Sequence, residues 1–456
     1  MISKITNIFK VPELRNKIAF TAALLFVFRL GGIVLVPGVD REVVKEFIAF
    51  SQTGAGSIFG LYNLFAGGFF SQFSIFALGI MPYISASIII QLLGSVVPYF
   101  QRLQKEGPEG RKKITQLTRY GTVLIASVQA IGVCVLLTSL DVSDGTGAGR
   151  FLVADPSMMF YFTTCIILVT GTVFVMWLGE QITNHGIGNG ISLIIMVGIL
   201  ASLPKVAIQQ ISNLFSDDPS LVTNPFSFII SFILLVSIVV FVVLMSTAVR
   251  KIPVSYAKRI VGRKMYGGQA THLPLKILTA GVMPIIFAQA LVIIPTSLAS
   301  FFPNTSFGMF LQRNFGDFTA IPYMIFLFFM IVGFTYFYTA VAFNPIDVAD
   351  NMKKQGGFIP GVRPGKSTAD FIDNILSRIT LPASVFLGFI AVLPNIIARF
   401  SNGGIDISTA SFFGGTSILI LVGVALDTLQ QIESQLLMRN YEGFLKSGKI
   451  KGRKRY

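Results

Sequence analysis

The sequence predicts an all-α, polytopic membrane protein of ten transmembrane helices, arranged as two inverted halves of five helices each. Three observations predict this fold class: the apolar composition, the spacing of long uncharged runs, and the uneven placement of basic residues. Of the 456 residues, 53% are hydrophobic and 12% are charged, whereas an ordinary soluble domain carries roughly 25% charged residues. A soluble fold with this composition would expose large apolar patches, so lipid is the expected solvent.

Long uncharged runs mark the expected spans, because about 20 apolar residues cross the ~30 Å hydrocarbon core as a helix. Arg29 interrupts the first run, and Glu180 separates the third run from the fourth. The nine runs that each correspond to one crossing are residues 18–36, 120–140, 156–179, 181–204, 219–249, 277–312, 318–346, 379–398 and 407–426.

The remaining run, residues 47–101, decides the topology. Its 55 uncharged residues are nominally enough for two helices. If it crosses once, 29 of the 36 basic residues lie on one face, six lie on the other, and Arg29 lies within the first span. A second crossing would largely invert that asymmetry, so the excess of Lys and Arg in cytoplasmic loops favours one crossing. We therefore expect ten spans with both termini in the cytoplasm.

Ten spans divide evenly at a loop outside the cytoplasm, residues 205–225. The expected N-terminal half is 1–204 and the C-terminal half is 226–438, followed by a basic cytoplasmic tail, 439–456. Because five is odd, the second half starts on the opposite face from the first, which predicts inverted repeats. The basic N-terminus is typical of a signal peptide, but Val36-Pro37-Gly38 indicates a helix end, so we expect an uncleaved first span.

The first part of the 47–101 run has the composition of a re-entrant segment. Residues 58–74 contain Gly60, Gly67, Gly68 and Asn63, and they leave no room to complete a crossing before Pro82. Broken backbone at membrane depth is tolerated where protein or a water-filled cavity surrounds it. We expect a short apolar helix inside the bundle at about 58–74, as in channels and transporters. The alternative is a helix lying on the membrane surface.

Two long cytoplasmic loops are predicted to be docking surfaces. Residues 250–276 contain seven basic and no acidic residues. The alternation of apolar and basic residues there predicts a projecting hairpin. Residues 343–378 contain repeated Gly and Pro turn signals. The alternative is that both loops are plain solvated connectors, which would need neither the length nor the embedded Tyr256, Phe358 and Ile359.

The sequence lacks the HExxH and GxSxG motifs that are characteristic of enzyme active sites. His185 and His272 fall in predicted cytoplasmic loops. The run 186–190 lacks the Lys-Ser/Thr of a phosphate loop and is interpreted as a flexible helix start. Cys134 and Cys165 lie in apolar runs and are interpreted as small core residues. We expect no catalytic residue, no metal and no cofactor.

Charge also bears on partners and on transport. A net charge of +15 would suggest a nucleic-acid partner for a soluble protein, but basic cytoplasmic loops account for most of it, so no specific nucleic-acid site is expected.

Arg29 is the charge expected within a span, pairing with backbone or a nearby polar group. Glu180 is expected to cap the fourth span, while Asp427 and Glu433 lie near the cytoplasmic end of the last. These residues form no obvious proton relay.

Pairs of isoleucines four residues apart share a helix face and are candidate pore linings. Ile80 and Ile84 flank Pro82, and Ile191 and Ile195 repeat the spacing in the fifth span. Isoleucines at such spacing usually pack against a neighbouring helix or lipid. A hydrophobic constriction can nevertheless seal a pore by dewetting.

Six stretches, in order along the chain, resemble the SecY family. They are residues 65–93, 105–121, 170–192, 256–276, 343–366 and 413–419. They cover nearly every span and both long loops. The resemblance implies a ten-helix hourglass that conducts unfolded secretory polypeptides and releases transmembrane segments sideways into lipid. One departure is Ile346, where many relatives carry a basic residue, which puts part of that loop's electrostatic contact in doubt.

The resemblance also implies roles for residues, matched by motif. The pore ring would be Ile80, Ile84, Ile191, Ile195, Ile286 and Ile420. The plug at 58–74 would include Asn63, Phe65, Gly67, Gly68 and Phe69. A lateral gate between the second and seventh spans, with the third and eighth alongside, would involve Ser85, Ile88, Gln91, Ile294 and Leu298. Docking of the ribosome or a motor would involve Lys258, Arg259, Arg263, Lys264, Lys353, Lys354 and Arg363.

The partners implied by the resemblance are the small membrane subunits SecE and SecG, the SecA ATPase motor, the translating ribosome, signal sequences and unfolded polypeptide clients, in the bacterial inner membrane. The residues disfavour two rival functions. An inverted-repeat transporter for a small solute predicts charged sites at mid-membrane and short cytoplasmic loops, and the sequence has neither. An intramembrane enzyme would need a catalytic set, which the sequence lacks.

Overall fold

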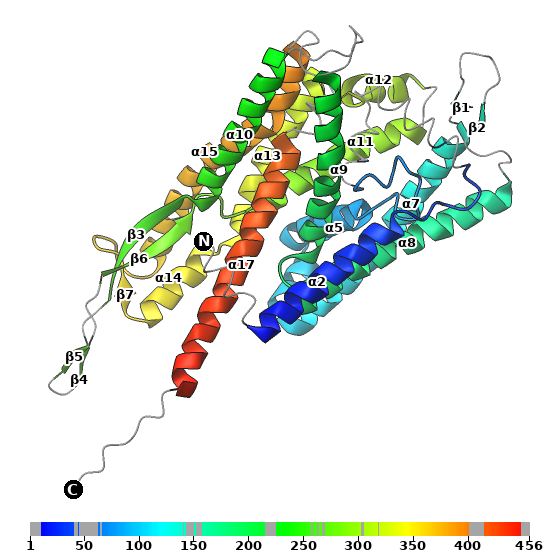
Figure 1. Cartoon of the computed structure of the whole chain (residues 1–456). Helices are drawn as coiled ribbons and strands as arrows, with labels where there is room; N and C mark the ends of the chain where they lie inside the picture. The colour runs from blue at the N-terminus through cyan, green and yellow to red at the C-terminus, as the bar shows by residue number, and fades with distance from the viewer. Residues whose placement is uncertain are drawn as a thin grey trace.

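The structure is a computed structural model of the whole chain. It describes residues 11–40, 44, 63, 66–139, 141–142, 150–151, 157–214, 225–256, 259–261, 264–266, 270–301, 305–317, 319–400 and 415–447. Figure 1 shows a bundle of long helices, with a small sheet at one end.

The long helices follow the expected spans. In the first half they are α2 (Pro12–Gly31), α5 (Met81–Val96), α7 (Pro108–Ser139), α8 (Met158–His185) and α9 (Gly190–Leu214). In the second half they are α10 (Pro225–Thr247), α11 (Met283–Phe301), α13 (Ile321–Ala342), α15 (Lys366–Phe400) and α17 (Gly415–Ser447). Shorter helices are α6 (Pro98–Lys105), α12 (Ser306–Phe315) and α14 (Pro345–Lys354).

Length and hydropathy single out most of these helices as membrane spans. Among the described residues, five stretches in α7, α8, α13, α15 and α17 are long and apolar enough to cross a membrane. Helices α5 and α6 form a sixth, bent by 96°. Helices α9, α10 and α11 contribute shorter apolar stretches, and α2 carries four charged residues among its 20. Each of the ten helices falls on one expected span, so the ten-helix fold class is confirmed.

The expectation of one crossing for residues 47–101 agrees with the described part of that run. Residues 66–80 form turns, and α5 is the long helix that follows. Its N-terminus is set by Pro82 in the first turn, where a missing backbone N–H costs no hydrogen bond.

The two halves meet along two seams. On one side α11 contacts α5 and α7, and on the other α17 contacts α9. Within the second half, α13 packs against both α11 and α15. Large apolar side chains on the outside of the bundle, such as Phe26, Phe232 and Phe329, are exposed, as expected for helices solvated by lipid.

The loop 250–276 forms the predicted hairpin. Strand β3 (Val249–Tyr256) pairs antiparallel with β6 (Ala270–Lys276), and β4 (Arg259–Val261) pairs with β5 (Lys264–Tyr266) toward the tip. Along β3, Ile252 and Val254 are buried while Lys251 and Pro253 are exposed, which is the alternation of a strand with one buried face.

The second long loop adds a strand to this hairpin. Strand β7 (Gly357–Phe358) pairs with the end of β3 through Ser255 with Phe358 and Tyr256 with Gly357. The resulting sheet has the order β6-β3-β7. We call the sheet β6-β3-β7, the β4–β5 hairpin, α14, residues 359–365 and the first turns of α15 the platform. It has its own hydrophobic core of Ile252, Val254, Leu275, Met352, Ile359, Ile372 and Leu376.

The platform lies at one end of the bundle, together with the start of α2 and the end of α17 (Figure 1). At the opposite end lie α12 and a short hairpin of β1 (Asp141–Val142) and β2 (Arg150–Phe151). This arrangement agrees with the expectation that both termini share the side of the two long basic loops.

Candidate functional site

The isoleucines expected to line a pore converge on the interior of the bundle. Ile80 caps the start of α5, Ile84 follows on its first turns, and the others come from α9, α11 and α17. Five of the six are at most 3% exposed: Ile80, Ile84, Ile195, Ile286 and Ile420. All five belong to one hydrophobic cluster drawn from both halves. This placement suits a constriction, and a pore-lining role stays a prediction.

Ile191 is placed differently from the other five. It is half-buried and packs against the same cluster. A Cβ on Gly179 of α8 would lie 3.3 Å from its Cγ1, so the first turn of α9 packs closely on α8.

The described part of the expected plug, residues 66–74, consists of turns. Gly67 and Gly68 have φ values of +73° and +87°, and Phe73 has φ +47°. These left-handed conformations cannot continue a right-handed helix, so the expected helix is wrong for residues 66–74. Asn63 is helical, and Phe65 lies outside the described residues.

These turns satisfy much of their own backbone hydrogen bonding. The Gly68 N–H donates to the Asn63 carbonyl at 2.8 Å, and the Ser71 N–H donates to Asn63 Oδ1 at 2.9 Å. The Ser71 hydroxyl donates to the Gly68 carbonyl at 3.1 Å. At membrane depth, an unpaired backbone group would cost several kcal/mol. In a regular helix the Ser71 N–H would donate to a backbone carbonyl, and here the Asn63 side chain accepts that hydrogen bond instead.

Helix α2 and the residues that follow it, 34–36, anchor this segment at two points. Arg29 Nη1 donates to the Gly67 carbonyl at 2.8 Å, and the guanidinium lies 5.0 Å from the centre of the Phe69 ring. The expectation that Arg29 pairs with backbone is therefore confirmed. Farther along, the Val36 N–H donates to the Phe73 carbonyl at 3.0 Å, and the Ile75 N–H donates to the Val34 carbonyl at 2.9 Å.

Aromatic rings fill the space between the segment and span one. Phe28 of α2 contacts Phe69 edge-on at 5.1 Å and stacks on Phe76 at 6.2 Å. The adjoining glycines make room for these rings. A Cβ on Gly31 would lie 2.0 Å from Phe76, and one on Gly32 would lie 1.8 Å from Phe69.

The expected lateral gate coincides with the seam between α5 and α11. Ser85 and Ile88 are buried on α5, and Ile294 of α11 is exposed. Gln91 is half-buried, and its Nε2 donates to Ser87 Oγ at 3.1 Å. Leu298 belongs to α11, but its side chain lies outside the described part. The third span, α7, contacts both gate helices, and the eighth, α13, contacts α11.

Two buried amides near this seam were missed by sequence reasoning. Gln129 of α7 and Gln289 of α11 have buried Oε1 atoms with no hydrogen-bond partner among the described residues. Gln289 is 1% exposed. Each is an amide in an otherwise apolar stretch, and that contrast could have singled it out. Polar side chains inside a span are costly and commonly functional.

The expected docking residues lie on the platform where the structure describes them. Lys353, Lys354 and Arg363 are exposed. Arg259 lies on β4 opposite Tyr266, and Lys264 lies on β5 opposite Val261. Lys258 and Arg263 lie outside the described residues.

The loop that carries Arg363 is ordered by local contacts. Thr368 Oγ1 donates to the Arg363 carbonyl at 2.9 Å. Gly361 and Gly365, on either side, have φ values of +85° and +108°. At the other end of this loop region, Ile346 is exposed on the first turn of α14.

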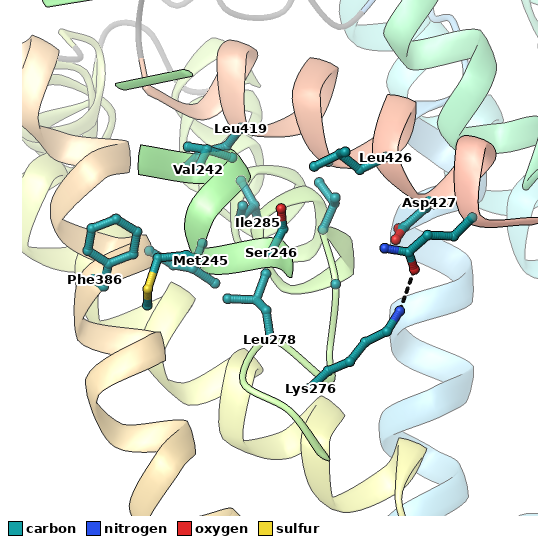
Figure 2. A pocket seen from close by; sticks show the side chains of 15 residues that line it. Val242, Met245, Ser246, Lys276, Leu278, Ile285, Phe386, Leu419, Leu426 and Asp427 are labelled. Carbon is teal, nitrogen blue, oxygen red and sulfur yellow. Dashed lines mark hydrogen bonds between the residues drawn. The ribbon is translucent and has the colours of Figure 1, made fainter. Parts of the chain in front are cut away.

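A hollow lies among α10, α15 and α17, and residues between Lys276 and Ile285, which lead from β6 into α11, also line it (Figure 2). Lys276, the last residue of β6, donates a hydrogen bond to the side-chain oxygen of Gln430 on α17, and Asp427 lies beside this pair. The chain enters α11 through a left-handed turn at Gly281, packed against Asp427. Helix α17 also carries Ile420, so the platform is joined directly to a helix of the expected ring.

Other polar side chains fix neighbouring helices. Arg119 of α7 makes a two-pronged ion pair with Glu180 of α8, at 3.0 and 2.6 Å. The expectation that Glu180 caps the fourth span is wrong, because Glu180 lies inside α8; it instead ties spans three and four together. Cys134 and Cys165 form no disulfide, and their sulfur atoms lie 3.6 Å apart. Among the described residues, no group of three or more His, Cys, Asp or Glu could hold a metal.

The glycine-rich turn between α8 and α9 is tightly packed. The Ile187 N–H donates to Thr21 Oγ1 of span one at 3.1 Å, and the Gly190 N–H donates to Thr183 Oγ1 at 2.9 Å. A Cβ on Gly190 would lie 2.0 Å from the Gly179 carbonyl oxygen. Close packing, rather than the expected flexibility, explains the glycines here.

Comparison with known proteins identifies relatives along the whole chain. A family model described as SecY matches residues 74–429. Protein translocase subunit SecY of Streptomyces coelicolor is 44% identical over 449 residues, covering 98% of this chain and all of the relative. The SecY subunit of Bacillus subtilis is likewise 44% identical over 449 residues, with the same coverage.

Solved structures with the same fold extend this similarity. A structure described as a protein-conducting channel has a TM-score of 0.60 at 19% identity, covering 95% of this chain and 94% of that one. A SecY structure described in terms of a plug domain that stabilises the closed channel has a TM-score of 0.64 at 18% identity, with the same coverage. Canine Sec61 from a ribosome-channel complex has a TM-score of 0.58 at 17% identity, again covering 95% and 94%.

Proposed function

The chain belongs to the SecY family, and from this premise we propose how its ten helices conduct polypeptide. It is the channel-forming subunit of a protein translocase. Unfolded secretory polypeptides pass through it, and transmembrane segments leave it sideways into lipid. The observation that carries this function is the 44% identity to translocase subunits over 98% of the chain. A small-solute transporter has no support among these relatives.

The channel's seal is a ring of Ile80, Ile84, Ile191, Ile195, Ile286 and Ile420. Aliphatic side chains offer no fixed hydrogen-bonding partners, so the ring accommodates any extended polypeptide sequence. When no polypeptide is present, an apolar constriction excludes water and therefore ions. Support comes from the burial of five of these residues in one cluster built from both halves.

The segment around residues 58–74 acts as the plug, with Asn63, Phe65, Gly67, Gly68 and Phe69 among its residues. It rests against span one through Arg29 and the Phe28 ring. The lateral gate lies between α5 and α11, near Ser85, Ile88, Gln91, Ile294 and Leu298. A signal sequence is an apolar helix that binds the open gate better than the closed one, and this difference in affinity shifts the channel toward the open state.

The platform is the docking surface for cytoplasmic partners. Its exposed cations, Lys353, Lys354 and Arg363, together with the basic hairpin residues Lys258, Arg259, Arg263 and Lys264, suit the phosphate backbone of ribosomal RNA or an acidic patch on a motor. The ribosome has support in the fold shared with canine Sec61 from a ribosome-channel complex. The SecA motor supplies the energy, and SecE and SecG complete the membrane assembly.

The topology follows from the same platform. The basic loops 250–276 and 343–378 face the cytoplasm with both termini, in the bacterial inner membrane. Residues 1–204 and 226–438 form the two halves, joined on the other side through residues 205–225; the expected loop is wrong for residues 205–214, which continue α9. Support comes from the common end of the bundle shared by the platform, the start of α2 and the end of α17.

Replacing ring residues tests the seal. We expect Ile84→Ser, Ile195→Ser and Ile420→Ser, combined in one chain, to raise the ion conductance of idle reconstituted channels, because hydroxyls let water wet the constriction. Ile166→Ser, which changes an exposed isoleucine of α8, serves as the matched control. An ion conductance equal to that of the unmodified channel would contradict the seal.

A further inference from the structure

Arg29 places a cation within span one, where the surrounding helix surface is apolar. Phe26, Leu30 and Ile33, on neighbouring turns, are exposed on the outside of the bundle and are therefore solvated by lipid. A charge at this depth is costly, and such residues usually mark a functional contact. Arg29 is half-buried, and the contacts of its guanidinium among the described residues are with the plug.

The guanidinium makes two kinds of contact with the plug. Nη1 donates to the Gly67 carbonyl at 2.8 Å, a charge-assisted hydrogen bond. The cation also lies 5.0 Å from the Phe69 ring centre, within the range of a cation–π interaction. Gly67 also lies close to α9, because a Cβ there would lie 3.0 Å from the Gly198 Cα.

The other end of the plug is held by a different kind of contact. Two backbone hydrogen bonds, Val36 to Phe73 and Ile75 to Val34, flank an antiparallel bridge between Leu35 and Ser74. Ile75 is also packed against α8, since a Cβ on Gly171 would lie 2.1 Å from its carbonyl oxygen. Backbone pairing of this kind does not depend on any single side chain.

The two attachments therefore differ in how water affects them. When the pore is dry, Arg29 has the Gly67 carbonyl as its partner. When polypeptide and water enter, water competes for both groups and the net strength of the hydrogen bond falls. The bridge at Leu35 and Ser74 keeps its backbone partners.

We propose that Arg29 is a latch that holds the Gly67 end of the plug in the closed channel, and that the Leu35–Ser74 bridge is the hinge about which the plug swings. Arg29 is thus a positioning residue for the seal. This inference rests on the proposed role of residues 58–74 as a plug.

The latch is tested with Arg29→Met and Arg29→Lys, with Phe26→Leu as a lipid-facing control on the same helix. Complete channels are reconstituted with their small subunits and motor. Two quantities are measured per inserted channel: idle ion conductance, and export of a precursor whose signal helix carries a charge in its apolar core. We expect Arg29→Met to raise both quantities about tenfold. Arg29→Lys should raise them less, because an ammonium keeps the charge but lacks the planar arrangement of donors of a guanidinium. Phe26→Leu should change neither quantity.

Unchanged conductance and unchanged selectivity in Arg29→Met, in channels that export a normal precursor, would overturn the latch. Failure of the unmodified channel to export a normal precursor would instead contradict the proposed function itself. If Arg29→Met does not insert, Arg29→Lys decides, because the latch predicts an increase in conductance for it and a purely structural role predicts none.

The hinge is tested with Leu35→Cys and Ser74→Cys together, in a chain that also carries Cys134→Ala and Cys165→Ala. Oxidation joins the two introduced thiols. Because a hinge need not separate, export of a normal precursor should continue at the rate of the reduced channel. Loss of export on oxidation, restored by reduction, would show that this end of the plug must also move and would overturn the hinge.

Discussion

The plug segment and the platform both contain non-helical backbone, and among the described residues they satisfy its hydrogen-bonding groups in different ways. The platform uses a regular sheet, in which β3 pairs with β6 over seven residues and with β7 over two. The plug segment uses local turns, one asparagine side chain and one arginine from span one. The platform buries a small core of its own, while the plug segment shares the main core of the bundle.

The difference follows from the solvent around each region. Water can hydrogen-bond to the free backbone N–H and C=O groups at the edges of a sheet, so the platform tolerates short strands and exposed loops. Lipid cannot form such hydrogen bonds, so each polar group of the plug needs a partner in the protein or in a water-filled pore. The platform is therefore expected to stay folded through the working cycle, whereas the plug has contacts that water can replace. Changes to one region should leave the other's function intact.

The largest effect is expected from Arg363→Glu on the platform. Reversing an exposed charge on a basic docking surface places like charges together, which costs several kcal/mol at an interface. Export should be abolished while the channel still inserts and its idle ion conductance is unchanged. Export of a secretory precursor into inverted vesicles measures the first, and planar-bilayer recording the second.

Arg313→Glu, on exposed α12 at the other end of the bundle, is the matched control and should export normally. Normal export by the Arg363→Glu channel would contradict the docking role of the platform.

A smaller effect is expected from Gly171→Val, which acts on the plug side. Its Cβ would meet the Ile75 carbonyl oxygen at 2.1 Å, so the plug segment or α8 must shift, at a cost of about 1–3 kcal/mol for overpacking. Idle conductance should rise and binding of the cytoplasmic partners should be unchanged. Gly333→Val on α13 is the control, because a Cβ there meets nothing within 4 Å. Equal idle ion conductance in the two variants would contradict the proposal that this segment contributes to the seal.

The smallest effect on transport is expected from Ile372→Ala, in the core of the platform. Ile372 is fully buried, and truncation there costs about 2–5 kcal/mol of local stability. Because the platform's hydrogen bonds remain, we expect weaker partner binding and slower export, with no change in idle conductance. Partner affinity measured by sedimentation checks this. Ile346→Ala changes an exposed isoleucine of the same platform, and this control should bind the partners normally. A rise in idle conductance for Ile372→Ala would contradict the independence of the two regions.

Sequence patterns predicted the parts of the fold that repeat with a simple period. Uncharged runs located the ten helices, and the alternation around Ile252 and Val254 predicted the hairpin. The pairing of Ser255 with Phe358 joins segments about 100 residues apart, and no local pattern encodes such a contact. The same limit applies to Lys276 and Gln430, which meet from two distant segments.

The plug shows a different limit. Its apolar residues suggested a helix, while Gly67 and Gly68 adopt left-handed turns that depend on partners elsewhere in the chain. Arg29 stood out because a charge inside a span is expensive, although its partner could not be named until the Gly67 carbonyl was seen beside it. The six isoleucines could be matched by motif, yet the half-burial of Ile191 depends on how α9 packs on α8.

The most direct test of the central claim is transport by purified components. Proteoliposomes containing this chain, its small membrane subunits and an active motor are given a secretory precursor and ATP, and the precursor protected from external protease is measured. A closable apolar channel predicts that full-length precursor accumulates inside, and that accumulation stops in the Arg363→Glu channel. Precursor that binds and stimulates ATP hydrolysis but never becomes protected would contradict the account.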